Sequence, residues 1–350
     1  MGLGIQPWLA RATFGLNNSA VRRFEQRHHI VVVTYHRVGD AAQIHPEPVE
    51  LAEATLPQFE AQMDWIGQHC NPITLEQTLQ VANGKDDFPN RAVLVTFDDG
   101  YREDLERVLP SMRRNGIRPV VFLPTAFVGT NLRFWWDRVG VCVRATTRDH
   151  LVLPEAGTMN LPLGTEGQKV EAIERLLDRA AHMRPDAKAQ LLAGLERELE
   201  VDDTTRADEP VVVGWGDVAR LAEDMDFGAH TETHPMLSML SADEARAEMA
   251  GSKAALEEKL KMPCHSFAIP YGDSAAYTQE TLHVASQVGF SLVFTLEESL
   301  RNLRWQGSTA IMDRMTFDQT DGVSGMAAKI TWPRIFIPDW VGRLRDLLPL

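Results

Sequence analysis

The sequence has little of what marks disulfide-rich, nucleic-acid-binding or membrane proteins. It contains only three cysteines, Cys70, Cys142 and Cys264, which are far apart and form no CxxC spacing. This excludes a disulfide framework or a cysteine-based zinc site and indicates free thiols in a reducing compartment. Acidic residues outnumber basic ones, and the formal net charge is −14. Nucleic acid is therefore not an expected partner, because phosphate binding needs clustered basic residues. A local basic groove for an anionic sugar remains compatible with this charge.

Long apolar runs are also missing. No stretch reaches the ~18 apolar residues that a membrane-spanning helix needs. Residues 1–30 carry several charges and do not resemble a secretory signal. We therefore expect a cytoplasmic protein. Both ends mix aromatic and basic residues, as in Trp8 with Arg11 and Trp340 with Arg343. We expect terminal helices that pack on the domain, with peripheral membrane contact through the termini as the alternative.

Short apolar runs alternate with amphipathic helical patterns along most of the chain. The runs predict strands of a parallel sheet, because strands covered on both faces lack polar alternation. They are Ile30–Tyr35, Ala92–Phe97, Pro119–Leu123, Asp226–His230, Ser266–Pro270 and Phe290–Thr295, with Thr309–Met312 as a further candidate. Helices are predicted at about 57–69, 75–83, 103–115, 241–261 and 278–288. Alternation of this kind indicates a parallel barrel or a doubly wound sheet.

One region interrupts the alternation. Residues from about 133 to 212 contain the segment FWWDRVGVCVR, a loop rich in proline and glycine, and a long charged helix near 167–200. We expect a helical insertion into a main domain of residues 30–320. Residues 1–29 then form an N-terminal segment, and residues 321–350 form a C-terminal amphipathic segment.

Two expected strands end in residues that can hold a metal. VTFDDGY places the adjacent carboxylates Asp98 and Asp99 before a turn at Gly100. One carboxylate can bind a metal while the other acts as a base, and a solvated turn is the alternative. FGAHTETHP places His230 and His234 at the end of another strand, before a tight turn. Two imidazoles and one carboxylate make a three-ligand catalytic metal site, and two surface histidines are the alternative.

A third strand ends in FAIPYGD, around Tyr271. This segment is either a simple turn or a rigid one that aims a backbone N–H at a developing oxyanion. The three segments, found in this order and each at the end of an apolar strand, point to one protein family far more specifically than any single segment does. Together they resemble the polysaccharide deacetylase (NodB-homology) family, carbohydrate esterase family 4. YHRV at 35–38 and FWWDRV at 134–139 resemble segments of its bacterial exopolysaccharide branch.

The resemblance implies a distorted parallel (β/α) barrel of the polysaccharide deacetylase type with a helical insertion. It also implies metal-dependent hydrolysis of an N-acetyl or related acyl group on an amino sugar. Asp98 would be the general base, and the backbone N–H of Tyr271 would stabilise the oxyanion. Asp99, His230 and His234 would hold one divalent metal, which we expect to be Zn²⁺. The expected partner is an amino-sugar glycan or a lipid- or nucleotide-linked precursor, and a cytoplasmic location favours the precursor.

The sequence departs from the family pattern in two places. Ala268 stands where the third motif usually has an arginine, and we expect Arg314 in MDRMTFD to replace it, with a surface ion pair as the alternative. The Leu-x-His segment that supplies the general acid is absent, since no histidine follows His283. His36 is a candidate for this acid, although a structural histidine is the favoured interpretation. A non-catalytic glycan-binding or scaffolding protein on the same fold is the alternative function. Another amide or an O-acetyl ester is the alternative bond.

Overall fold

The computed structural model describes the barrel domain and its insertion. The described residues are 30–39, 52–153, 159–201, 204–205, 207–297, 303–317 and 319–331. The N-terminal segment 1–29 and residues 332–350 lie outside them, so the alternative of a membrane contact through the termini also falls outside the described residues. Across the described part of the chain, no helix combines the length and the apolar character that a membrane crossing requires.

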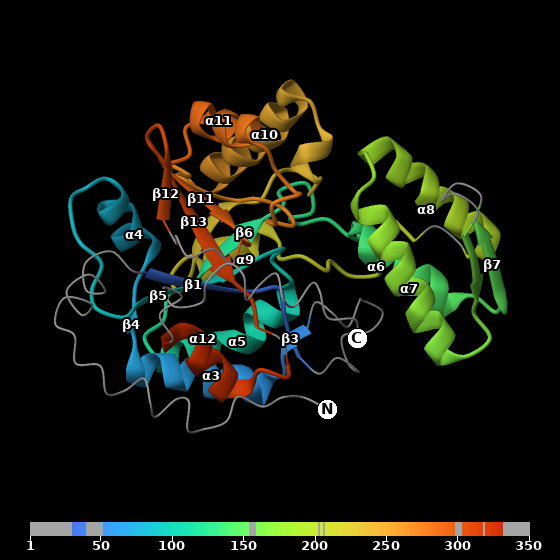
Figure 1. Cartoon of the computed structure of the whole chain (residues 1–350), viewed down its shortest axis with the longest axis horizontal. Coiled ribbons are helices and arrows are strands. Elements are labelled where there is room, and N and C mark those ends of the chain that lie inside the picture. The colour runs from blue at the N-terminus through green and yellow to red at the C-terminus, as the bar shows by residue number, and fades with distance from the viewer. Residues whose placement is uncertain are drawn as a thin grey trace, which may run out of the picture.

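Parallel strands form a closed barrel, as the sequence resemblance implied (Figure 1). The strands follow one another around the barrel in chain order, and β1 pairs with both β5 and β13, which closes it. Two short strands extend the sheet at its sides, β4 (Asn71–Pro72) beside β5 and β12 (Leu303–Gln306) antiparallel to β13. The barrel strands are β1 (Ile30–Tyr35), β5 (Ala92–Phe97), β6 (Val120–Leu123), β9 (Asp226–Ala229), β10 (Ser266–Ala268), β11 (Leu292–Thr295) and β13 (Thr309–Met315).

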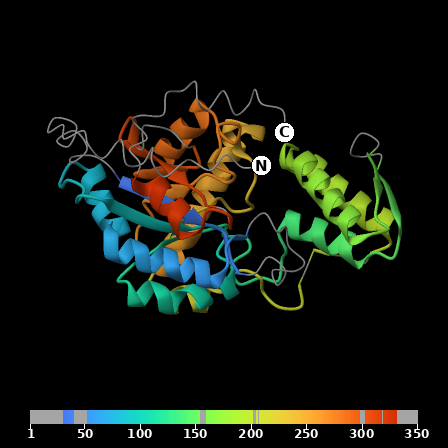
Figure 2. The same cartoon turned by 60° about the horizontal axis from the view of Figure 1, so that its bottom comes forward.

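Helices surround the barrel. Figures 1 and 2 show α3, α5 and α12 together on one side of the barrel, away from α10 and α11. The five helices predicted outside the insertion are confirmed to within one residue at each end, and capping residues such as Thr74 and Ser241 mark their starts. The helices are α3 (Leu56–His69), α4 (Leu75–Ala82), α5 (Arg102–Arg114), α9 (Trp215–Leu221), α10 (Ala242–Leu260), α11 (Gln279–Val288) and α12 (Gly322–Thr331).

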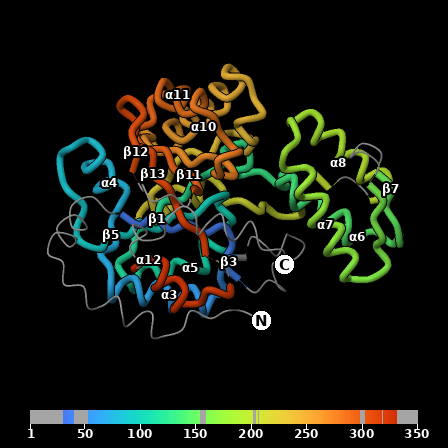
Figure 3. Tube along the Cα trace, in the orientation of Figure 1, coloured from blue at the N-terminus to red at the C-terminus, as the bar shows by residue number. Residues whose placement is uncertain are grey.

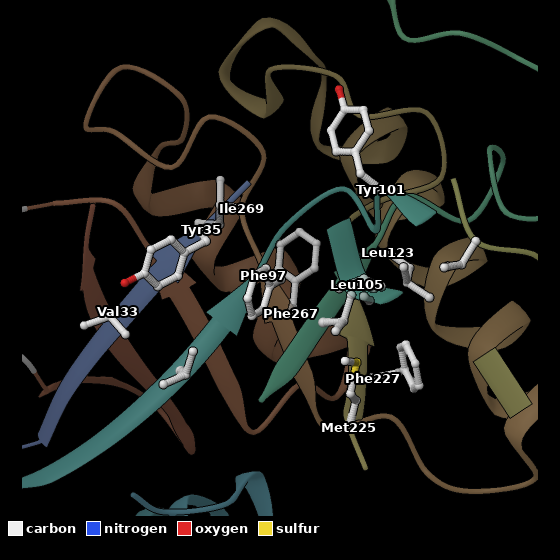
Figure 4. Packing of buried hydrophobic residues seen from close by; sticks show 14 of the residues in the cluster. Val33, Tyr35, Phe97, Tyr101, Leu105, Leu123, Met225, Phe227, Phe267 and Ile269 are labelled. Carbon is white, nitrogen blue, oxygen red and sulfur yellow. The ribbon is translucent and has the colours of Figure 1, made fainter. Parts of the chain in front are cut away.

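Alternate residues of the barrel strands belong to two different cores. The larger core lies between the barrel and its helices, and Figure 4 shows part of it, including Tyr35 and Phe97. The smaller core takes the intervening residues and lines the barrel, and it includes Val32, Leu94, Phe122, Ala268, Phe294 and Met312. Side chains two positions apart share a face of a strand. His36, Asp98 and Arg314 therefore continue the inner face at the carboxyl ends of their strands.

The insertion lies beside the barrel as a separate group of elements (Figure 3), and it folds around a core of its own. The long charged helix predicted near 167–200 is wrong: two helices occupy this span, because Pro185 begins the second one and lacks the N–H that would continue the first. The stretch rich in proline and glycine, residues 153–164, is expected to be a loop, but it contains β8, which pairs with β7 in an antiparallel hairpin. The elements of the insertion are α6 (Trp135–Ala145), β7 (His150–Leu153), β8 (Met159–Pro162), α7 (Glu166–Ala181) and α8 (Pro185–Leu199).

Candidate active site and metal centre

Two adjacent carboxylates leave the end of β5 in different directions. Asp98 continues the inner face of the strand, whereas Asp99 has a φ of 66°, in the left-handed region that such residues seldom adopt. Gly100 follows with a φ of 69°, and a Cβ there would lie 2.3 Å from Leu123 Cδ2. This turn keeps both carboxylates buried while each faces its own partners.

Arg314, at the end of the last barrel strand, holds Asp98. Its two Nη atoms donate to the two carboxylate oxygens of Asp98, each at 2.7 Å. Nη1 also donates to the hydroxyls of Thr34 and Thr96. Arg314 is only 1% exposed, so the surface ion pair weighed as its alternative does not occur. Burial alone would raise the pKa of Asp98, but Arg314 first, together with His230 and His36, outweighs burial and holds the pKa below its usual range.

The two histidines lie on a tight turn after β9. Thr231 and His234 have φ values of 67° and 58°, so the turn is not helical, as predicted. His230 Nδ1 lies 2.8 Å from the carbonyl oxygen of Ala268. Because a carbonyl only accepts, Nδ1 carries the proton and Nε2 keeps its lone pair. This Nε2 lies 3.8 Å from Asp99 Oδ1, and His234 Nε2 lies 3.4 Å from the same oxygen.

Asp99, His230 and His234 fit a divalent metal. One ligand atom from each lies within 4.8 Å of the others. Asp99 Oδ1 is buried and has no hydrogen-bond partner in the described structure, and burial raises the pKa of Asp99 to about 7. A cation would compensate this carboxylate, which is otherwise costly to bury. Burial also lowers the pKa of both histidines, that of His230 to about 4, so both imidazoles are neutral near pH 7, the form that binds metals.

His36 lies beside Asp98. Its Nε2 is 3.7 Å from Asp98 Oδ2, and its Nδ1 is 2.5 Å from Glu53 Oε1. Burial alone would lower the pKa of His36, but the neighbouring carboxylates, Glu53 first and then Asp98 and Asp99, together raise the pKa to about 9. The His36 side chain remains 16% exposed, so a protonated imidazole is accessible next to Asp98. The sequence did not point to Glu53, because only the pairing of β2 (Arg37–Val38) with β3 (Ala52–Ala54) brings it to His36.

Tyr271, in the turn after β10, contacts the insertion. Its φ is 64°, and its ring centroid lies 5.3 Å from that of His234. Trp135 Nε1 in α6 donates to the Tyr271 hydroxyl at 3.0 Å, and Lys188 Nζ in α8 donates to it at 3.1 Å. The ring of Trp136 lies 4.9 Å from that of His234. The insertion therefore forms part of the wall around the metal ligands. The FWWDRV segment marked this region in the sequence, but nothing marked Lys188.

The family comparison matches the chain from α8 of the insertion to the start of β11. Residues 186–293 match the model of the polysaccharide deacetylase family, a segment that contains His230, His234 and Tyr271 but not Asp98. The Bacillus subtilis protein YxkH, a polysaccharide deacetylase by its given name, is 22% identical over 144 residues. These residues are 39% of this chain and 49% of YxkH, so the chain matches about half of that relative.

Three solved structures share the fold. IcaB from Ammonifex degensii has a TM-score of 0.56 at 19% identity, over 87% of this chain and 98% of that one. The Streptococcus pyogenes deacetylase PplD, in complex with acetate, has a TM-score of 0.52 at 13% identity and the same coverage. A de-N-acetylase from Aggregatibacter actinomycetemcomitans has a TM-score of 0.53 at 15% identity, over 86% and 99% of the two chains. The matched segment, the barrel and the order of the strand-end motifs together make the chain similar to the polysaccharide deacetylase family.

Proposed function

We propose that the protein is a metal-dependent hydrolase that removes an N-acetyl or related acyl group from an amino sugar of a glycan or glycan precursor. The observation that carries this proposal is the separation of two neighbouring carboxylates. Asp98 is paired with Arg314, whereas Asp99 faces two neutral imidazoles. One carboxylate is thus ionised and outside the ligand set, as a general base must be, and the other lies within the ligand set.

The reaction begins with proton removal from water. A divalent metal held by Asp99, His230 and His234, which we propose to be Zn²⁺, would lower the pKa of a water molecule and polarise the acyl carbonyl. Asp98 accepts the proton of the attacking water, since its Oδ2 lies 3.9 Å from His230 Nε2, at the edge of the ligand set. The backbone N–H of Tyr271 donates to the negative charge that develops on the carbonyl oxygen of the acyl group.

The leaving amine also needs a proton, and we assign its delivery to His36. The pair with Glu53 keeps this imidazole protonated near neutral pH, and the ring lies 3.7 Å from Asp98. The C–N bond then breaks with a neutral amine as the leaving group, and the acyl group leaves as the acid. His36 would thus act as the general acid in place of the histidine of the Leu-x-His segment, which this sequence lacks.

Acetate release tests the proposal. The protein, reconstituted with Zn²⁺, is incubated with N-acetylated amino sugars that are free, in oligomers, or linked to a nucleotide or a lipid. We expect release by the wild-type protein and strongly reduced release by Asp98→Asn, which keeps the proposed metal ligands. Binding of sugar oligomers without release from any substrate would instead support a glycan-binding protein. Release from O-acetyl esters alone would assign a different bond.

The substrate panel also bears on location. A cytoplasmic location, expected from the sequence, is what favours a linked precursor over a finished polymer. We therefore propose higher kcat/KM for nucleotide- or lipid-linked sugars than for free oligomers. A fluorescent fusion in the native host checks the location independently.

A further inference from the structure

The insertion reaches the barrel through one face of α8. Arg184, which directly precedes this helix, and Lys188 are four positions apart and share that face. Arg184 Nη2 lies 3.1 Å from Glu244 Oε1 at the start of α10. Lys188 Nζ lies 3.1 Å from the Tyr271 hydroxyl and 4.2 Å from the centroid of the Trp135 ring. The contact of Arg184 with the barrel thus helps to hold Lys188 beside the metal ligands.

Lys188 is a buried cation with no acidic partner. Its side chain is only 7% exposed, and no carboxylate of the described residues lies within ion-pair distance of it. Burial lowers the pKa of Lys188 to about 8. A buried ammonium of this kind costs stability unless an anion accompanies it. Packing alone therefore does not explain a lysine at this position.

The hydroxyl of Tyr271 is oriented by two donors. An indole N–H and an ammonium can only donate, so the phenol oxygen accepts the bonds from both Trp135 and Lys188. A phenol is protonated at neutral pH, so Tyr271 also has an O–H of its own to donate. Among the residues that the structure describes, no acceptor takes this O–H. The side chain is partly exposed, so the proton is available to a ligand.

We propose that Lys188 and the Tyr271 hydroxyl bind an anionic group, a carboxylate or a phosphate, that the substrate carries close to its acylamino group. Lys188 supplies the positive charge and further N–H donors, and Tyr271 supplies an O–H donor. The Tyr271 ring lies 5.3 Å from that of His234, so the anion binds close to the reacting acyl group. This inference rests on the proposed function and names the substrate class for the same site.

The test compares charged and neutral versions of one sugar. The probes are N-acetylglucosamine, its 1-phosphate and N-acetylglucosaminuronic acid, and the two charged probes distinguish phosphate from carboxylate. We expect the wild-type protein to prefer at least one charged probe, mainly through a lower KM. Lys188→Met should reduce the charged-to-neutral ratio of kcat/KM about 10- to 100-fold, the usual worth of a charged hydrogen bond. Lys188→Arg should restore part of the ratio, and Tyr271→Phe should reduce it by a smaller factor.

Lys169→Met is the matched control. Lys169 also lies in the insertion, but it donates to the carbonyl oxygens of Arg144 and Thr146, so its loss should leave the ratio unchanged. Calorimetric binding of the same probes to Asp98→Asn separates this inference from the proposed function. Preferential binding of a charged probe that Lys188→Met abolishes supports the anion site even if no probe is hydrolysed. Hydrolysis with equal kcat/KM for all probes, or an unchanged ratio in both Lys188→Met and Tyr271→Phe, would overturn it.

Discussion

Arg314 donates one hydrogen bond to each carboxylate oxygen of Asp98 across 216 positions of the chain. Arg314 lies on β13 and Asp98 directly follows β5, and both strands pair with β1. The orientation of Asp98 therefore depends on the closure of the barrel. This relationship leads directly to a prediction for each partner.

Replacement of Arg314 should slow turnover and shift its pH dependence. Arg314→Lys keeps the charge but loses the two-bonded geometry. The pKa of Asp98 should then rise, and since a base must be ionised, the acidic limb of the pH–rate profile should move to higher pH. Arg314→Ala leaves a buried carboxylate unpaired and should destabilise the protein by about 3–5 kcal/mol. The measurements are pH–rate profiles and urea unfolding, with metal content as the control. Wild-type turnover with an unshifted acidic limb in both variants would place the orienting group elsewhere.

Asp98→Asn should separate catalysis from metal binding. We expect turnover to fall about 10²- to 10⁴-fold, the usual worth of a general base. Metal content should stay near that of the wild type, because Asp98 faces Arg314 rather than the ligand set. Single-turnover kinetics and metal analysis of the same preparation check this. Retained full activity would show that another group takes the proton.

Replacement of either proposed histidine ligand should abolish metal binding. His230→Ala or His234→Ala should remove the metal from the purified protein, because each leaves only two of the three ligands. The wild-type protein should melt at a higher temperature when Zn²⁺ is added, since a ligand that binds only the folded state stabilises it. Neither histidine variant should show this increase. Full metal occupancy in His230→Ala would show that His230 is not a metal ligand.

The pair of His36 and Glu53 should set the alkaline limb of the pH–rate profile. Glu53 raises the pKa of His36 to about 9, and a general acid acts only while protonated. Glu53→Gln should lower this pKa, so the alkaline limb of the pH–rate profile should move to lower pH. His36→Ala should slow turnover while metal content stays unchanged. If the alkaline limb does not move in Glu53→Gln, His36 is a structural histidine.

Lys188→Met should stabilise the protein at neutral pH. The pKa of Lys188 falls from 10.5 to about 8 on folding, so the folded state disfavours its charge below about pH 8. The cost is at most about 3 kcal/mol at 1.36 kcal/mol per unit, and the lost contact with Trp135 reduces the net gain. The gain should vanish as the pH rises above 10.5, where lysine is neutral in both states. Urea unfolding at pH 7 and pH 11 measures this difference, and lower stability of the variant at pH 7 would contradict it.

The barrel could be predicted because its strands are continuous apolar runs. The same runs located Asp98 and His230, since parallel strands present chemistry at their carboxyl ends. The sequence could not predict Glu53 or Lys188. Each is one charged residue among many, and it reaches the site only through tertiary contacts, the pairing of β2 with β3 and the docking of α8. The break before Pro185 was visible in the sequence, but the charged pattern continued through it and suggested one helix.

The left-handed backbone at the site has a consequence for how the sequence can change over evolutionary time. Asp99, Thr231, His234 and Tyr271 all have positive φ values, and each such residue costs about 1–3 kcal/mol. Glycine or asparagine would relieve the cost, but at Asp99 and His234 it would also remove a proposed ligand. A lineage that needs the chemistry must keep this strain. A lineage that abandons it gains stability from substitutions that an active protein cannot accept. After a loss of activity, substitutions should therefore appear at these positions before they appear in the barrel core.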